Sequence, residues 1–339
     1  MPWYAASGSF PSMTAVGIPK GLPRSDTCFS PCCDDAWVEI LRRRAANTAS
    51  GAYPAPLGEL LGEMAAAGVL MQSNIKFDGA LILQIQGDGP VKLAVAEVNA
   101  DLSLRATATL IGDVSASATL SEMVNVNNQG KCAITLDAKN RRPGQQAYQG
   151  VVPLFGDKRE KLERISDVLA HYMLQSEQLE TTLVLAADDK VAAGLLIQKM
   201  PAGGGKLTLA AQKELESDPN YLDAFNRISI LAASLKREEL LTLDVDTILR
   251  RLFWEEQLLR FEPQAGESAP RFACTCSRER VARMLKSLGR EEAESIIAER
   301  GEIEVGCEFC GQQYRFDPID AAQVFVDATG LQAAPGSLQ

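Results

Sequence analysis

Four cysteines near the C-terminal end constrain the fold of this chain more than any other stretch. One residue separates Cys274 from Cys276; Cys307 and Cys310 follow about thirty residues later, separated by two. Each pair can present two sulfurs to one ion while the segment between them folds back. The single histidine, His171, lies about a hundred residues upstream, so a metal bound here would be held by thiolates alone. The spacing predicts a Zn²⁺ site.

Three interpretations of this cluster are open from the residues themselves. The cysteines could form a structural zinc site that stabilises a small domain, or they could form structural disulfides. The Cys-x-Cys half also allows a redox role, because two cysteines so close together can close a small, strained disulfide, and strained disulfides are the labile ones. Gly306 and Gly311 flank the Cys-x-x-Cys half and allow the tight turn that a zinc knuckle needs.

Charge and composition limit the partners and the compartment. The chain has 339 residues, enough for two domains, and a net charge of −10. Such an acidic balance weighs against nucleic acid as a partner. The apolar run from Met64 to Met71 is far too short to span a membrane and is typical of a buried helix. No charged and apolar secretory signal occurs in the first thirty residues, so we expect a cytoplasmic protein with reduced thiols.

The chain alternates between strand-like and helix-like segments, which predicts an α+β fold. Period-two patterns at 81–86, 91–95, 102–110 and 132–136 predict an antiparallel sheet, with Val91, Leu93 and Val95 on one face of the second strand. A helix is expected at 157–176 and further strands at 181–187 and 191–200. Residues 1–33 lack either period and are predicted to be disordered or poorly packed. Cys28, Cys32 and Cys33 have no fourth ligand nearby and match no known spacing, so we interpret them as incidental thiols.

The second half of the chain predicts a helical linker and a small terminal domain. A glycine-rich run at 201–208 lacks the spacing of a phosphate-binding loop and marks the end of the first domain. Residues 221–261 are helical in pattern and too apolar to stand in water, so they must cover the first domain, either permanently or detachably. After Pro270 we expect helices at 277–288 and 291–300, two short strands, and a helix that begins at Asp317-Pro318. The predicted divisions are 1–33, 34–205 (core), 206–270 (linker) and 271–339 (zinc-binding domain).

With these residues in view, the chain resembles the heat-shock protein thirty-three family of redox-regulated chaperones. The resemblance covers roughly 34–327, and Cys-x-Cys followed about thirty residues later by Cys-x-x-Cys is its most specific part. It also rests on the segments Lys76–Gly79, Gln84–Pro90, Leu104–Ala106, Tyr148–Val151, Gln175–Leu179, Ala193–Gln198 with Met200-Pro201, Glu238–Leu241 and Cys274–Arg280. Family members usually open with a strand containing Val-Arg-Gly, which residues 1–33 lack; if that strand is absent, an edge of the sheet is left unpaired.

The resemblance implies an ATP-independent holdase chaperone rather than an enzyme. In the reduced, inactive form Cys274, Cys276, Cys307 and Cys310 would hold Zn²⁺. Oxidation would pair Cys274 with Cys276 and Cys307 with Cys310, release the zinc, unfold the switch and the linker, and expose apolar surface. The implied partners are unfolding client proteins and, when oxidised, a second copy in a homodimer, with neither nucleic acid nor membrane.

A rival from another class is a zinc-ribbon protein that uses a static structural zinc to dock a partner. An enzyme is disfavoured because no nucleophile, base and orienting group occur together in a recognisable motif. A thiol oxidoreductase would place Cys-x-x-Cys in a βαβ context that is absent from the pattern.

Overall fold

The structure is a computed structural model that describes residues 14–17, 25–31, 34–47, 51–142, 144–199, 219–256, 259–260 and 269–325. Contacts within the chain divide it into two units, residues 1–273 and 274–339. Arg271 and Phe272 form strand β11, which pairs in parallel with β5 of the first unit. The division thus falls just after the expected start of the C-terminal domain at 271.

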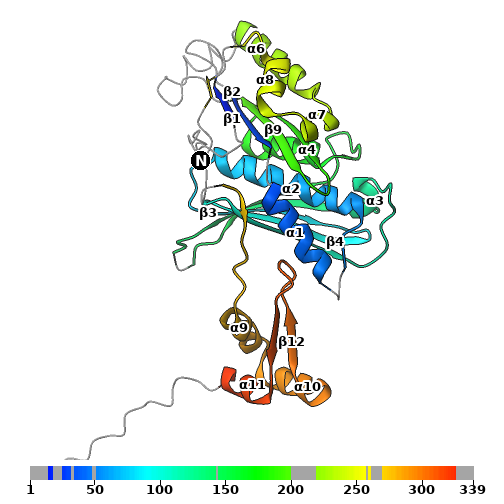
Figure 1. Ribbon diagram of the computed structural model, residues 1–339, viewed down its shortest axis with the longest axis vertical. Helices are drawn as coiled ribbons and strands as arrows, with labels where there is room; N and C mark the ends of the chain where they lie inside the picture. The colour runs from blue at the N-terminus through cyan, green and yellow to red at the C-terminus, as the bar shows by residue number, and fades with distance from the viewer. Residues whose placement is uncertain are drawn as a thin grey trace, which may run out of the picture. The chain divides into compact units, whose positions relative to one another are not determined.

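A long helix, α2 (Ala55–Asn74), lies at the centre of the first unit, between two sheets (Figure 1). The six-stranded sheet has the order β11-β5-β4-β3-β6-β7 and the five-stranded sheet the order β10-β1-β2-β9-β8. Helices α1 (Asp34–Ala46), α3 (Leu120–Val124) and α4 (Ile165–Glu177) complete this part. The strands are β1 Thr14–Gly17, β2 Ser25–Pro31, β3 Gly79–Gln86, β4 Val91–Asn99, β5 Ser103–Leu110, β6 Lys131–Ala138, β7 Tyr148–Pro153, β8 Thr181–Ala187, β9 Ala192–Lys199, β10 Leu259–Arg260 and β11 Arg271–Phe272.

From Leu60 to Gln72 every residue of α2 except Glu63 is buried, because this part of the helix is covered on nearly all sides. Every apolar residue from Met64 to Met71 is buried, which confirms the prediction of a buried helix. Close approach also requires glycine: a Cβ at Gly62 would lie 2.4 Å from the Cβ of Ala187, and one at Gly68 would lie 2.9 Å from Val98. The helix therefore holds the two sheets together through one shared core. The mixed α+β fold is confirmed.

The antiparallel pairing of β3 with β4 and of β4 with β5 confirms the predicted meander. The predicted inward face of β4 is wrong, however. Ala94, Ala96 and Val98 are the residues that point into the core, whereas Leu93 and Val95 are only half-buried. A register irregularity between Val91 and Leu93 is the reason. One extra residue in a strand moves every following side chain to the other face.

The N-terminal segment also differs from expectation. Strand β2 pairs antiparallel with β9 from Ser25↔Lys199 to Pro31↔Ala193, and β1 pairs with β2. Residues 14–17 and 25–31 are thus strands rather than disordered chain, and β2 pairs with β9 along the edge of that strand. A ready-made neighbouring strand supplies backbone hydrogen-bond partners regardless of local periodicity, which is why the sequence pattern did not reveal them. Cys32 and Cys33 lie outside the described residues.

Three helices cover the outer face of β8 and β9: α6 (Pro219–Ala233), α7 (Arg237–Thr242) and α8 (Val245–Phe253) (Figure 1). Leu195 and Ile197 of the sheet pack against them in a separate core. The almost wholly helical pattern expected over 221–261 is therefore divided into three helices, and Leu259–Arg260 form strand β10 rather than helix. Trp254 belongs to the apolar 221–261 segment that was predicted to cover the first domain, but it follows the last residue of α8 and is 76% exposed. We call α6, α7 and α8 the cover.

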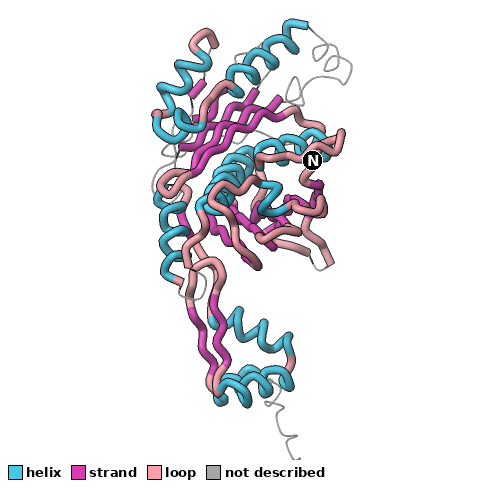
Figure 2. The backbone as a smooth tube through the Cα atoms, turned by 90° about the vertical axis from the view of Figure 1, so that its right-hand side faces the viewer, coloured by secondary structure: helices cyan, strands magenta, loops and turns pink. Residues whose placement is uncertain are grey.

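The C-terminal unit contains α9 (Arg278–Leu288), α10 (Arg290–Arg300), β12 (Ile303–Gly306), β13 (Gln313–Phe316) and α11 (Pro318–Phe325). These elements match the predicted order. Strands β12 and β13 form a hairpin, with the three helices gathered near its open end (Figure 2). Asp317 caps α11 by accepting a hydrogen bond from the Asp320 amide at 2.7 Å. The Asp-Pro start signal predicts this cap. The buried core of the described part of this unit consists of Leu285, Ala293, Ile303, Phe316 and Ala321.

Candidate metal centre

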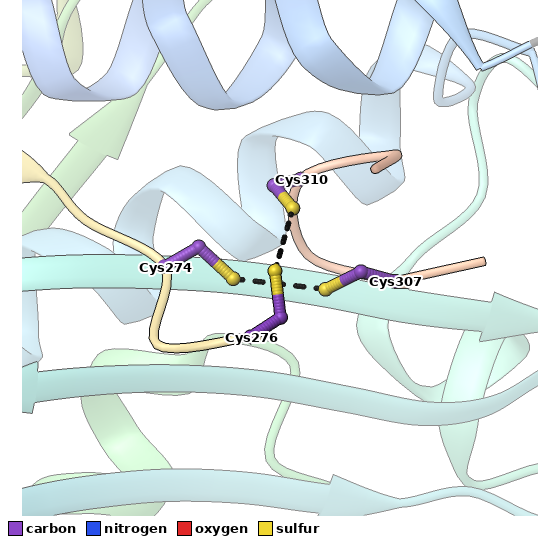
Figure 3. A group of neighbouring side chains, drawn as sticks. All are labelled: Cys274, Cys276, Cys307 and Cys310. Carbon is purple, nitrogen blue, oxygen red and sulfur yellow. Dashed lines mark hydrogen bonds between the residues drawn. The ribbon is translucent and has the colours of Figure 1, made fainter. Parts of the chain in front are cut away.

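The four cysteines come from two loops of the C-terminal unit that face each other (Figure 3). Cys274 and Cys276 lie in the segment directly before α9, where Ser277 caps the helix by accepting a hydrogen bond from the Arg280 amide. Cys307 and Cys310 lie in the turn that joins β12 to β13. All four residues belong to the second unit of the chain, so the cluster is part of one small fold.

The cluster has the size of a four-sulfur metal site. All four Sγ atoms lie within 4.8 Å of one another. Sγ of Cys274 is 3.6 Å from Sγ of Cys307, and Sγ of Cys276 is 3.3 Å from Sγ of Cys310. In a tetrahedral zinc site with bonds of about 2.3 Å, neighbouring sulfurs are roughly 3.8 Å apart. The donor set and its dimensions therefore fit Zn²⁺, and no disulfide joins these residues.

Backbone hydrogen bonds shape the turn that carries the second pair. The Gly311 amide donates to the Cys307 carbonyl at 2.8 Å, and the Cys307 amide donates to the Gln312 carbonyl at 2.9 Å. Gly311 has a φ of 73° and turns the chain directly after Cys310. Such a positive φ strongly favours glycine. This closed turn brings the two sulfurs of a Cys-x-x-Cys segment to the same side.

Two arginines of α9 hold the first loop and the helix in place. Arg280 donates to the carbonyl and the hydroxyl of Thr275, the residue between the first two cysteines. Arg278 donates to the Arg315 carbonyl at 2.7 Å and pairs with Asp320 at 2.6 Å. Its guanidinium also stacks on the ring of Phe316, 4.2 Å from the ring centre. Such a contact between a cation and an aromatic face is attractive. These contacts fix α9, and with it the first loop, to the hairpin and to α11.

Tyr314 contributes to the site although the sequence predicted it only as a strand residue. Its hydroxyl donates a hydrogen bond to Sγ of Cys276 at 3.1 Å. Hydrogen bonds to a ligating sulfur orient it and stabilise the thiolate. Its position four residues after Cys310, on the strand that leaves the turn, is the signal that could have identified it.

Protons are unevenly distributed over the thiols. Burial opposes ionisation of Cys274, but the hydrogen bonds that this sulfur receives from the Cys276 amide and the neighbouring thiols outweigh burial and lower its pKa to about 7. Burial raises the pKa of Cys307 and raises that of Cys310 well above its usual range. Cys274 therefore forms its thiolate readily, and the thiolate is the reactive form of cysteine towards metals and oxidants.

The remaining predicted residues stay apart from the cluster. Cys132 is completely buried in β6, and burial raises its pKa to about 12, so it is an inert core residue. His171 lies on α4, where its Nε2 is 3.9 Å from an Asp157 carboxylate oxygen. Among the described residues, the four C-terminal cysteines form the one group with metal-ligand geometry. No helix of the described part is long and apolar enough to cross a membrane.

Comparisons with known proteins identify the family of this chain. Residues 33–317 match the family model described as "Hsp33 protein". The "33 kDa chaperonin" of Chromobacterium violaceum is 42% identical over 292 residues, covering 86% of this chain and 87% of that protein. The protein of the same name from Pseudomonas fluorescens is 39% identical over 293 residues, covering 86% and 89%.

A solved structure has the same fold. The crystal structure of the 33 kDa chaperonin, a heat shock protein 33 homologue, from Thermotoga maritima matches with a TM-score of 0.67. The match covers 93% of this chain and 97% of that chain at 18% sequence identity. At this identity the likeness establishes the fold alone.

Proposed function

Because the chain belongs to the Hsp33 family, a family of chaperones and not of enzymes, we propose that it is a holdase whose client binding is switched on by oxidation of the four-cysteine cluster. The observation that carries the proposal is the convergence of the four sulfurs within one small unit. The clients are unfolding proteins, and the compartment is the reducing cytoplasm, where thiols persist until an oxidant arrives.

In the reduced state Cys274, Cys276, Cys307 and Cys310 are the ligands, as thiolates, with Tyr314 donating to one of them. Zn²⁺ held by these four thiolates would supply on the order of 10–16 kcal/mol of folding free energy at neutral pH. The C-terminal unit needs such a contribution because its buried core is very small for an independent fold. Its folding should therefore depend on the thiolates.

Oxidation removes the ligands. A thiolate of the cluster attacks hypochlorite or peroxide and becomes a sulfenic acid, and the neighbouring thiolate displaces water or hydroxide from it to form a disulfide. The formation of each disulfide transfers two electrons from the two thiolates to the oxidant. We propose that Cys274 pairs with Cys276 and Cys307 with Cys310. Disulfide sulfurs are poor metal ligands, so both halves of the cluster would then stop binding the metal.

The cover is the surface that the switch exposes. Leu249, Leu252 and Phe253 of α8 are buried against the outer core, and Leu195 and Ile197 lie beneath the cover on the sheet. Removing the cover would expose a contiguous apolar face on both sides, and large exposed apolar patches are what unfolding proteins bind. We propose that loss of the folded C-terminal unit releases this cover and that the oxidised form assembles as a homodimer.

The direct test is Cys307→Ser, with Cys132→Ala as a matched control that removes a thiol outside the cluster. We expect Cys307→Ser to lose stoichiometric zinc, measured by metal analysis, and to make residues 271–330 protease-sensitive. The control should keep one zinc and a resistant C-terminal unit. If the Cys307→Ser protein retained one zinc and a protease-resistant C-terminal unit, the assignment of these cysteines as metal ligands would be wrong.

Oxidant titration separates the switch from a static zinc ribbon that docks a partner. The switch must gain anti-aggregation activity, followed as light scattering of a heat-unfolded test protein, as zinc leaves. A static docking module should only lose function under the same oxidant. Mass spectrometry of the intact protein before and after oxidation counts the disulfides and shows whether a dimer forms.

A further inference from the structure

A groove on the C-terminal unit lies between α9, α10 and β12 and is separate from the cysteine cluster. Its volume is about 540 Å³. Its lining combines apolar and acidic side chains, which we call the floor and the rim of the groove. We call it the acidic groove; its lining includes Met284, Leu288, Ile296, Glu292, Glu299 and Glu304.

The shape of the groove follows from one residue. Gly289 is both the C-cap of α9 and the N-cap of α10, and its φ is 106°. Residues with a side chain rarely tolerate this conformation. Because a single residue joins them, the two helices diverge from this corner and form two walls. Strand β12 forms the third wall and pairs only with β13 among the described residues.

Two large apolar side chains of the floor are strongly exposed. Met284 is 47% exposed and Leu288 is 51% exposed. Both lie on α9 on either side of Leu285, which is 2% exposed and belongs to the core. Large apolar side chains that line a concave surface with a polar rim are typical of interaction sites.

Charge at the rim is strongly one-sided. The lining contains four glutamates and one arginine, Arg300. Arg315 pairs with Glu302 and Glu304, at 4.0 and 2.8 Å. Glu292 and Glu299 form no ion pair among the residues that the structure describes, and they lie two helical turns apart on the same face of α10. The basic residues of α9, such as Lys286, lie outside the lining.

We propose that the acidic groove binds a cationic amphipathic segment of another protein. Apolar side chains of the segment would rest on Met284 and Leu288, and its Lys or Arg side chains would pair with Glu292 and Glu299. Charge complementarity selects this partner, because the exposed carboxylates of Glu292 and Glu299 attract a cationic segment and repel an acidic one. The groove is built from elements of the folded C-terminal unit, so it is a surface of the reduced protein.

The test uses the full-length reduced protein and two short fluorescein-labelled peptides. One peptide has leucines on one helical face and lysines on the other; the matched peptide has glutamates in place of the lysines. Fluorescence anisotropy should show saturable binding of the lysine peptide that weakens as NaCl is raised, and weaker binding of the glutamate peptide. Absence of saturable binding of the lysine peptide, or equal binding of both peptides, overturns the proposal.

Two double variants localise the site. Glu292→Lys with Glu299→Lys should weaken binding of the lysine peptide by at least about tenfold, because the rim then repels it. Glu291→Lys with Glu294→Lys makes the same change in net charge on α10 outside the lining and should leave binding unchanged. Equal weakening by the two double variants would show that net charge alone attracts the peptide. That result refutes a binding site in the groove.

Leu288→Ser tests the floor independently of charge. The side chain is half exposed, so the substitution leaves the core of the unit intact, and the zinc content of the variant shows whether the unit remains folded. We expect a several-fold loss of affinity for the lysine peptide with normal zinc content. Unchanged affinity would mean that the apolar floor takes no part, which contradicts the proposal.

Discussion

Glu63 gives the first unit a pH-dependent stability that a single substitution should remove. It lies on α2 with 21% of its side chain exposed and faces two cavities of about 230 and 290 Å³. Burial raises the pKa of Glu63 from 4.5 to about 7; the nearby Arg237 opposes this shift, and Glu59 adds to it. A guanidinium nitrogen of Arg237 is 4.0 Å from the Glu63 carboxylate.

The sign and size of the effect follow from linkage. The folded protein holds the Glu63 proton more tightly than the unfolded chain, so the free energy of unfolding falls as the pH rises through the window from 4.5 to about 7. One pKa unit corresponds to about 1.4 kcal/mol, which makes the loss about 3 kcal/mol above pH 7. Glu63→Gln keeps the shape and removes the charge. The variant should therefore be more stable than the parent by about 3 kcal/mol at pH 8 and about equal to it at pH 4.

Urea unfolding at several pH values measures this difference. Trp37 is completely buried, and its indole donates to the Asp188 carbonyl at 2.8 Å, so its emission reports unfolding of the core. Asp113→Asn, which removes an exposed carboxylate, is the matched control and should run parallel to the parent at every pH. If the Glu63→Gln curve is also parallel to the parent between pH 5 and 8, the reasoning is refuted. A less stable variant at pH 8 would show that attraction to Arg237 exceeds the cost of burial.

Two further substitutions test the cover and the metal site. Arg237 ties α7 to the core through the Ala187 carbonyl and Glu59. Arg237→Ala should therefore loosen the cover by about 1–3 kcal/mol. Hydrogen exchange in α8 should accelerate, and the reduced protein should gain partial anti-aggregation activity. Substitution of an exposed residue, Arg250→Ala, should change neither. Unchanged exchange in the Arg237 variant would contradict the role of Arg237 in holding the cover to the core. Tyr314→Phe removes the hydrogen bond to Cys276. It should lower zinc affinity by roughly 10- to 100-fold in a chelator competition, and an unaltered affinity would show that the bond does not support the site.

Much of the fold could be predicted from local pattern. The period-two strands from β3 to β6, the buried α2 and the capped α11 all follow from spacing of apolar residues and from cap chemistry, which act over a few residues. The same holds for the cysteine cluster, because two chelating pairs in a short segment can meet whatever the rest of the chain does. The four predicted residues do converge.

Other features depend on residues far apart in the sequence. The pairing of β2 with β9 joins the N-terminal part of the chain to a strand beyond its middle, and a backbone partner so remote leaves no local signal. The inward face of β4 was predicted incorrectly because an irregularity near Leu93 shifts the register, and such irregularities are set by pairing with β5. Burial of Trp254 was likewise expected from its apolar character, whereas the end of α8 decides its exposure.

The sequence by itself determined the chemistry of this protein: four thiols at chelating spacing in a segment with a very small core. Local covalent spacing encodes that information. The tertiary structure decided which groups lie beside one another: Tyr314 beside Cys276, Arg237 beside Glu63, and the side chains that line the acidic groove. These contacts arise only when separate elements pack together, so their distances and desolvation are properties of the folded chain.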